Sequence, residues 1–68
     1  MMAKYAPKNE QGLAPYVREL TSLGRTNTSI VWAENLTEAK RKHGWTRMRH
    51  TSVKVRRATP EDMPQRDS

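Results

Sequence analysis

The sequence predicts a small two-layer α+β domain, in which a short sheet packs against one or two helices. Residues 29–33 form a β-branched and aromatic run, a capped helix signal follows at 35–44, and apolar and basic residues alternate over 51–56. With 68 residues, 34% of them hydrophobic, and a mean hydropathy of −1.02, the chain can fill one thin core.

A single domain is expected from about residue 13 to residue 58. Residues 1–12 show no repeating apolar spacing and are predicted to form a flexible N-terminal arm. Residues 59–68 combine Pro60 and Pro64 with charged neighbours and are predicted to form a flexible C-terminal tail.

The first element of the domain is predicted to be a helix over residues 15–23. Pro15 suits a first helical turn and Gly24 suits a C-terminal cap. The apolar residues that recur at helical spacing are Leu13, Tyr16, Val17, Leu20 and Leu23.

A strand is the alternative for this segment. Residues 16–21 contain β-formers and would pair with 29–33 as a hairpin, with 24–28 as the turn. The order of elements is α-β-α-β under the first interpretation and ββαβ under the second.

Residues 29–33 are apolar at both parities, which predicts a strand that is covered on both faces or central in its sheet, with Trp32 in the core. Asn35 and Glu38 have the spacing of a reciprocal capping box, and Gly44 would end the helix. The inner face of this helix is predicted to contain Leu36, Ala39 and the stem of Lys40, which leaves Thr37, Arg41 and Lys42 outward.

The last strand is predicted over residues 51–56, with its valines buried and its basic residues exposed. If it neighbours the strand at 29–33 and runs parallel to it, the crossover should be right-handed. The predicted core is Val17, Leu20, Ile30, Trp32, Leu36, Ala39, Val53 and Val55.

No motif for catalysis, metal binding or cofactor binding is present. The chain has no cysteine, and its two histidines, His43 and His50, would need further ligands to hold zinc. No glycine-rich phosphate loop and no nucleophile set is found. The sequence therefore predicts a binding protein that is not an enzyme and uses no cofactor. No apolar run resembles a signal peptide or a membrane span, so a cytoplasmic location is expected.

The most informative feature is the charge of residues 39–60, which carry eight cations and no Asp or Glu, whereas the rest of the chain is net negative. A run of charge is often only a solvated face, but one sign over so many positions favours a polyanion or an acidic protein surface as partner. Trp45 directly follows Gly44, where an apolar residue commonly packs back on the last helical turn, but it also stands between Lys42 and Arg47, where it would act as an anchor or a stacking platform. The predicted binding residues are Lys40, Arg41, Lys42, Trp45, Arg47, Arg49, Lys54, Arg56 and Arg57.

The junction of residues 33–39, with Trp45 and the strand-like 53–57 after it, resembles a turn in small phage-encoded proteins. One similar family is the podovirus inhibitor of host RNA polymerase, whose members place strands around one helix. This chain differs from that family by being basic where the inhibitor is acidic.

Small anti-CRISPR proteins that act on type I surveillance complexes are also similar, across Leu36, Ala39, Lys40 and Arg41. In that group the basic helix residues engage DNA or the nucleic-acid groove. The resemblance implies a phage-type inhibitor that binds a large protein or nucleoprotein complex in the cytoplasm of a bacterial host. A small nonspecific DNA- or RNA-binding protein is the alternative that the basic stretch supports.

Overall fold

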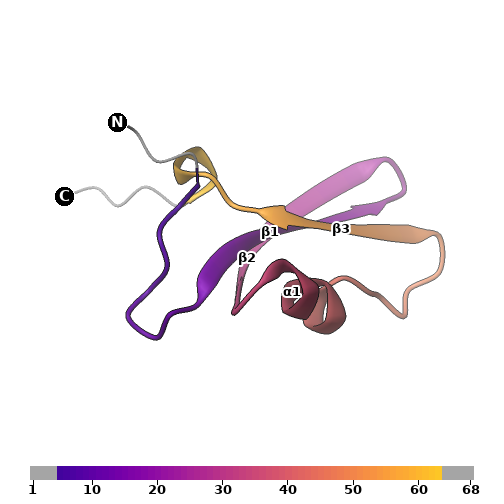
Figure 1. The fold of residues 1–68 in the computed structure, drawn as a ribbon. Coiled ribbons are helices and arrows are strands. Elements are labelled where there is room, and N and C mark those ends of the chain that lie inside the picture. The colour runs from indigo at the N-terminus through magenta and orange to yellow at the C-terminus, as the bar shows by residue number, and fades with distance from the viewer. Residues whose placement is uncertain (1–4, 64–68) are drawn as a thin grey trace.

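The computed structural model describes residues 5–63, which form a three-stranded sheet with one helix on one of its faces (Figure 1). The α+β class predicted from the sequence is confirmed. The elements in chain order are β1 (Ala14–Ser22), β2 (Arg25–Ala33), α1 (Leu36–His43), β3 (Thr51–Arg57) and a short 3₁₀ helix, η1 (Pro60–Asp62).

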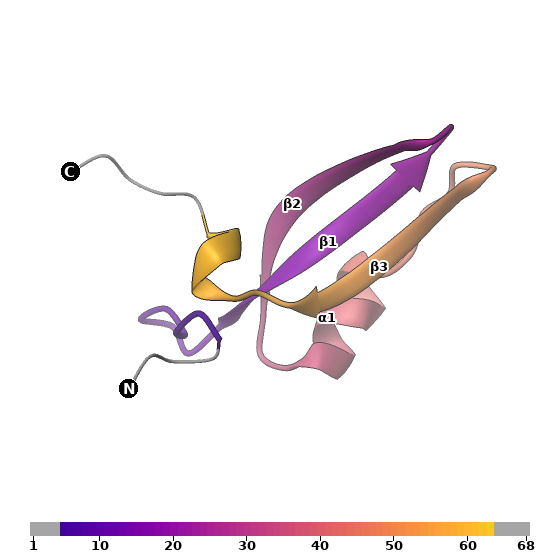
Figure 2. The same ribbon diagram turned by 90° about the horizontal axis from the view of Figure 1, so that it is seen from above.

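The strand order is β2-β1-β3, and both pairings are antiparallel (Figure 2). The hairpin register runs from Ala14 opposite Ala33 to Ser22 opposite Arg25. β1 lies between β2 and β3, so the two strands that flank α1 are parallel but are not neighbours, and the condition for the expected right-handed crossover is not met.

The predicted helix over residues 15–23 is wrong, and the alternative ββαβ order is the one observed. The segment is the central strand, and its backbone is paired on both sides. Both of its faces carry apolar side chains because both are partly covered, and this pattern happens to match helical spacing. Gly24, with φ +77°, belongs to the hairpin turn instead of capping a helix.

β2 is an edge strand, and its face that carries Trp32 is not covered, so the expectation that residues 29–33 are covered on both faces or central in the sheet is also wrong. Trp32 remains 37% exposed instead of lying in the core. It sits opposite Pro15, on the sheet face turned away from α1. One short helix covers only one face, so the second face, here called the open face, leaves the indole half in solvent.

The core lies between the sheet and α1 and is built from Ala14, Tyr16, Ala33 and Ala39, with Val31 and Val55 against them. Among the predicted core residues, Val17 and Ala39 are buried, whereas Leu20, Ile30, Val53 and Val55 are half-buried. Leu36 is 40% exposed, which corrects its assignment to the core. It is the first residue of α1 and lies at the margin of a contact centred on Ala39.

The predicted start and end of α1 are confirmed with one difference. The Asn35 side chain accepts a hydrogen bond from the Glu38 amide at 2.8 Å, and the Gly44 amide donates to the Lys40 carbonyl at 2.8 Å. A β-carbon at Gly44 would lie 2.5 Å from that carbonyl oxygen, so a glycine is needed there. The Glu38 carboxylate does not return to Asn35 but pairs with cations one turn later.

The two terminal segments meet at one end of the sheet (Figure 1). Ala6 is buried, and its amide donates to the Ala58 carbonyl at 3.0 Å. The chain therefore departs from the expectation of a loose arm at this residue, and η1 orders part of the expected tail. Residues 1–4 and 64–68, which also belong to the two predicted flexible segments, lie outside the described residues.

Candidate partner-binding surface

The basic side chains are divided between the two sides of the molecule. Lys54 and Arg56 lie opposite Glu19 and Val17 of β1, on the open face. The cations of α1 lie on the other side of the sheet, and Arg57 points to the same side as Tyr16. The fold does not bring the eight cations of residues 39–60 together into one patch.

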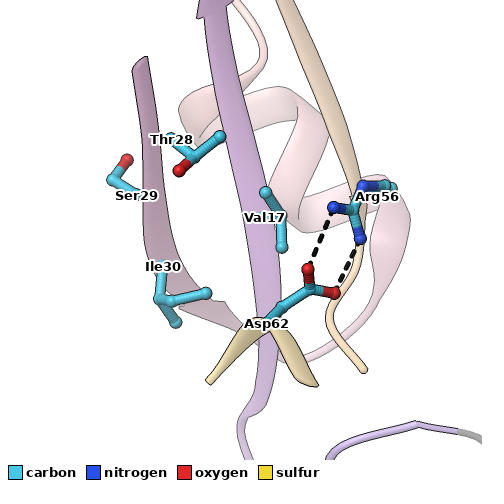
Figure 3. A pocket seen from close by; sticks show the side chains of 6 residues that line it. All are labelled: Val17, Thr28, Ser29, Ile30, Arg56 and Asp62. Carbon is cyan, nitrogen blue, oxygen red and sulfur yellow. Dashed lines mark hydrogen bonds and ion pairs between the residues drawn. The ribbon is translucent and has the colours of Figure 1, made fainter. Parts of the chain in front are cut away.

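Arg56 is held by two carboxylates within the protein, those of Asp62 (Figure 3) and Glu19. Its Nη1 and Nη2 donate to Asp62 Oδ2 and Oδ1 at 2.8 and 3.1 Å, and its Nε donates to Glu19 Oε1 at 3.3 Å. The guanidinium, together with the amide and hydroxyl of Thr59, lowers the pKa of Asp62, and the Asp62 carboxylate raises the pKa of Arg56. This fork-to-fork pair fastens η1 to the open face beside Val17 and Ile30.

Arg57 is also engaged within the protein. Its guanidinium carbon lies 5.6 Å from the centre of the Tyr16 ring and 5.7 Å from that of Tyr5. Its Nη2 donates to the Ala6 carbonyl at 2.7 Å. Arg57 therefore joins the N-terminal segment to the core through ring contacts and a hydrogen bond.

Two cations of α1 share one carboxylate on the helix surface. Lys42 Nζ lies 2.8 Å and Arg41 Nη2 lies 3.4 Å from Glu38 Oε1. The Lys42 hydrogen bond is the main cause of the lowered pKa of Glu38. Exposed pairs of this spacing add little stability, but Glu38 partly neutralises this face of the helix.

An open groove of about 480 Å³ lies between the C-terminal end of α1 and β2. Cationic side chains line it from β1, from α1 and from the connector between α1 and β3, and none of its lining residues is Asp or Glu. We call it the cationic groove; it is lined by Arg18, Ser29, Val31, Lys42, His43, Trp45, Thr46 and Arg47.

Trp45 is the largest exposed side chain of this groove. It is 53% exposed, and the Arg47 guanidinium carbon lies 5.5 Å from the centre of its ring. The Arg47 contact holds the indole beside the groove without burying it. This arrangement presents an aromatic face next to positive charge.

Arg18 is the residue of the groove that the sequence analysis missed. Its Nε donates to the His43 carbonyl at 2.8 Å and its Nη2 to the Trp45 carbonyl at 3.3 Å. These bonds satisfy carbonyls at the end of α1 and fix the start of the connector to β3. Arg18 has the same parity as Tyr16 on β1, so a strand assignment for residues 15–23 would have placed it toward the helix.

The remaining predicted cations are Lys40, Arg49 and Lys54. Lys40 and Lys54 line a second hollow that wraps around β3, with Gly44 and Val53 between them. Arg49 is exposed in the connector. Within residues 5–63 none of these three side chains forms an ion pair.

No group of three histidine, cysteine or carboxylate side chains among the described residues is placed to hold a metal ion. Likewise, no helix of the described part of the chain has the length and apolar character of a membrane span.

Comparisons of the chain with protein-family models, with curated proteins and with solved structures each found no match. The functional argument therefore rests on the groove and its surroundings.

Proposed function

We propose that this protein is a phage-type inhibitor, which blocks a bacterial nucleic-acid-handling complex by binding to it in the host cytoplasm. RNA polymerase and a CRISPR surveillance complex are the two targets that the resemblance of residues 33–39 implies. The observation that carries the proposal is the exposed Trp45, stacked by Arg47 at a groove that contains cations and no carboxylate.

Trp and Arg are the residues most enriched at the energetic centres of protein interfaces. Here they form one unit, and Lys42 lies in the same groove. Burial of the indole by a partner would remove apolar area from water, and the cations would fit an acidic rim. We therefore expect the partner surface to combine an apolar recess with Asp or Glu side chains.

Internal pairing of cations favours a protein partner over nucleic acid. Arg41, Lys42 and Arg56 each contact a carboxylate, and Arg57 is held by two rings and a carbonyl. Affinity for a duplex arises largely from cations that neutralise phosphates and release counterions. With half of the eight cations engaged internally, few remain for that role.

Binding of single-stranded nucleic acid is the second candidate, and one observation favours it. The cationic groove is open and has an exposed indole at its wall, which is the combination that single-strand binders use to stack bases and follow the backbone. The two candidates differ in their response to salt and to nuclease.

Affinity capture from bacterial lysate tests the proposal. The tagged protein should retain a discrete protein complex after nuclease treatment, with only partial loss as the salt concentration rises. Loss of every partner after nuclease would reject the inhibitor. A log-linear salt dependence, with a slope near −0.7 per neutralised phosphate on single strands, would identify the nucleic-acid binder instead.

A matched pair of charge reversals locates the surface. Arg47→Glu should reduce capture at least about tenfold, because it places a carboxylate beside Trp45 and removes a stacked cation. Lys8→Glu makes the same charge change at an exposed position of the N-terminal segment and should leave capture intact. Equal losses in the two variants would show that net charge alone governs binding.

A further inference from the structure

The hairpin turn between β1 and β2 has an unusual residue at its first central position. Leu23 has φ 51° and Gly24 has φ 77°, and Ser22 pairs directly with Arg25, so two residues close the hairpin in the pattern of a type I′ turn. Asn, Asp and Gly are the residues that normally occupy the first position, because a bulky side chain disfavours the left-handed region.

The Leu23 side chain gains nothing from the free protein in return. It is 91% exposed, the highest value among the exposed large hydrophobic residues of the described chain. Both the backbone angle and the hydration of the side chain therefore oppose leucine at this position. A residue that is unfavourable in the isolated fold on two independent counts is a candidate for a contact made elsewhere.

The turn does not stand alone at its end of the sheet. Ser22 also pairs with Thr51, which places the start of β3 beside the turn. Thr51 bonds to the carbonyl of Met48, whose side chain is 58% exposed, and the intervening His50 also has a positive φ of 59°. The two non-glycine residues with positive φ among residues 5–63 thus lie in adjacent turns.

Charge at this end has one sign. Arg25 and Arg49 flank the two turns, and no Asp or Glu occurs in residues 20–27 or 45–52. The surface offers two exposed apolar side chains between cations. Its complement is an apolar pocket with carboxylates on the rim.

We propose that the Leu23–Gly24 turn is a second contact element, which inserts the Leu23 side chain into an acid-rimmed apolar pocket of the protein target. This proposal rests on the proposed inhibitory function and adds Leu23, Arg25 and Met48, which are not among the predicted binding residues. Met48 lines the same contact, and Arg25 and Arg49 face the carboxylates.

A duplex is a less suitable occupant than a protein pocket. An apolar wedge that unstacks base pairs needs an extended basic surface around it, along which the bent duplex gains contacts. Only two arginines flank the turns, and four of the eight cations of residues 39–60 are engaged within the protein, at Arg41, Lys42, Arg56 and Arg57.

The first test measures the cost of leucine in the free protein. Leu23→Asn places a residue that tolerates the left-handed region in the turn and should raise the melting temperature by about 4 °C. Leu23→Met keeps an apolar side chain that is not β-branched and should leave the melting temperature within about 1 °C. A lower melting temperature for Leu23→Asn would show that leucine stabilises the free fold, and would overturn the proposal.

The second test detects the contact directly. A photoreactive benzophenone amino acid is placed at position 23, or at position 45 in a separate sample, and irradiated in nuclease-treated bacterial lysate. The proposal predicts a protein cross-link of discrete mass from position 23. Excess unlabelled Leu23→Met should compete this cross-link away, whereas Leu23→Asn should compete at least about tenfold less well.

Each other outcome has a defined meaning. A cross-link from position 45 without one from 23 overturns the turn contact and leaves the inhibitory function standing. Equal competition by the two variants overturns it as well. Cross-linking of position 23 only to nucleic acid, before nuclease treatment, identifies a duplex wedge. Absence of a cross-link from both positions rejects the inhibitor and the turn contact together.

Discussion

The two ends of the sheet use the same residue types in opposite ways. At the end where Ala6 pairs with Ala58, here called the closed end, Arg56 and Arg57 bind carboxylates, rings and a carbonyl of the protein itself. At the other end, here called the free end, the hairpin turn and the connector 44–50 expose Leu23, Trp45 and Met48 between cations. The cations of residues 39–60 lie in one continuous basic stretch of the sequence, whereas the fold places those of the two ends apart.

This difference teaches that a basic run in a small domain is partly a structural device. A chain with one thin core has few large side chains, and Arg57 compensates by packing against Tyr16 and Tyr5. The cations that remain available for a partner are those that the closed end does not use.

Loss of the Tyr16 ring at the closed end should destabilise the protein more than any other change considered below. Tyr16 is 3% exposed, belongs to the core cluster and contacts Arg57, so Tyr16→Ala should lower the free energy of unfolding by about 3–5 kcal/mol. Urea denaturation followed by circular dichroism measures this change. Tyr5→Ala removes the more exposed of the two rings that contact the same guanidinium and serves as the control. An equal loss in both variants would mean that the Arg57 contact, and not the core, dominates.

Arg18 links the core to the groove, and its loss should have an intermediate effect. Arg18→Met keeps the aliphatic stem but leaves the His43 and Trp45 carbonyls without their donor, which should cost about 1–3 kcal/mol. Faster hydrogen exchange at the end of α1 should accompany it. Arg25→Met changes an exposed arginine of the same sheet and should stay within about 0.5 kcal/mol. Unchanged exchange near Gly44 in Arg18→Met would contradict this role.

The pairing of η1 with the open face predicts a dependence of stability on pH. Arg56 holds the pKa of Asp62 below its ordinary value of 3.8, so the folded state favours the ionised form. The resulting stabilisation is present above pH 3.8 and is lost as the pH falls below it. Melting temperatures between pH 2 and pH 7 measure this loss.

In Asp62→Asn the melting temperature should fall less steeply below pH 3.8 than it does in the wild type. At pH 7 the melting temperature of this variant should be about 2–5 °C lower than that of the wild type. The substitution removes the charge while an amide oxygen can still accept from the Thr59 amide. Glu38→Gln is the control, because Glu38 also has a lowered pKa but holds only the exposed helix surface. A melting temperature that falls more steeply at acid pH in Asp62→Asn than in the wild type would contradict a stabilising role of the ionised Asp62 carboxylate.

The sequence predicted the second half of the chain better than the first. The capped helix and the alternating strand after it depend on local signals, the Asn35 cap, the Gly44 end and the period of two at Val53 and Val55, and the structure contains both elements. The apolar residues of 15–23 are compatible with both a helical and a strand pattern. Which period applies depends on pairing with β2 and β3, and that contact is not visible within the segment itself.

The candidate site was predictable only in part for the same reason. Trp45 and Arg47 are neighbours in sequence, so their proximity to Lys42 could be inferred without a fold. Arg18 reaches the groove from a strand that the sequence analysis placed in a helix. The pairing of Arg56 with Asp62 depends on η1 folding back over the sheet, which no local pattern indicates.

The most direct test of the account compares the two tryptophans, which lie on opposite sides of the sheet. Trp45 is 53% exposed and Trp32 is 37% exposed, and each is replaced by alanine. Variants that keep the wild-type circular dichroism spectrum are then compared for capture of a protein complex from nuclease-treated bacterial lysate. The account predicts at least about a tenfold loss for Trp45→Ala and little change for Trp32→Ala. Retention by Trp45→Ala with loss in Trp32→Ala would place the working surface on the open face and contradict the account.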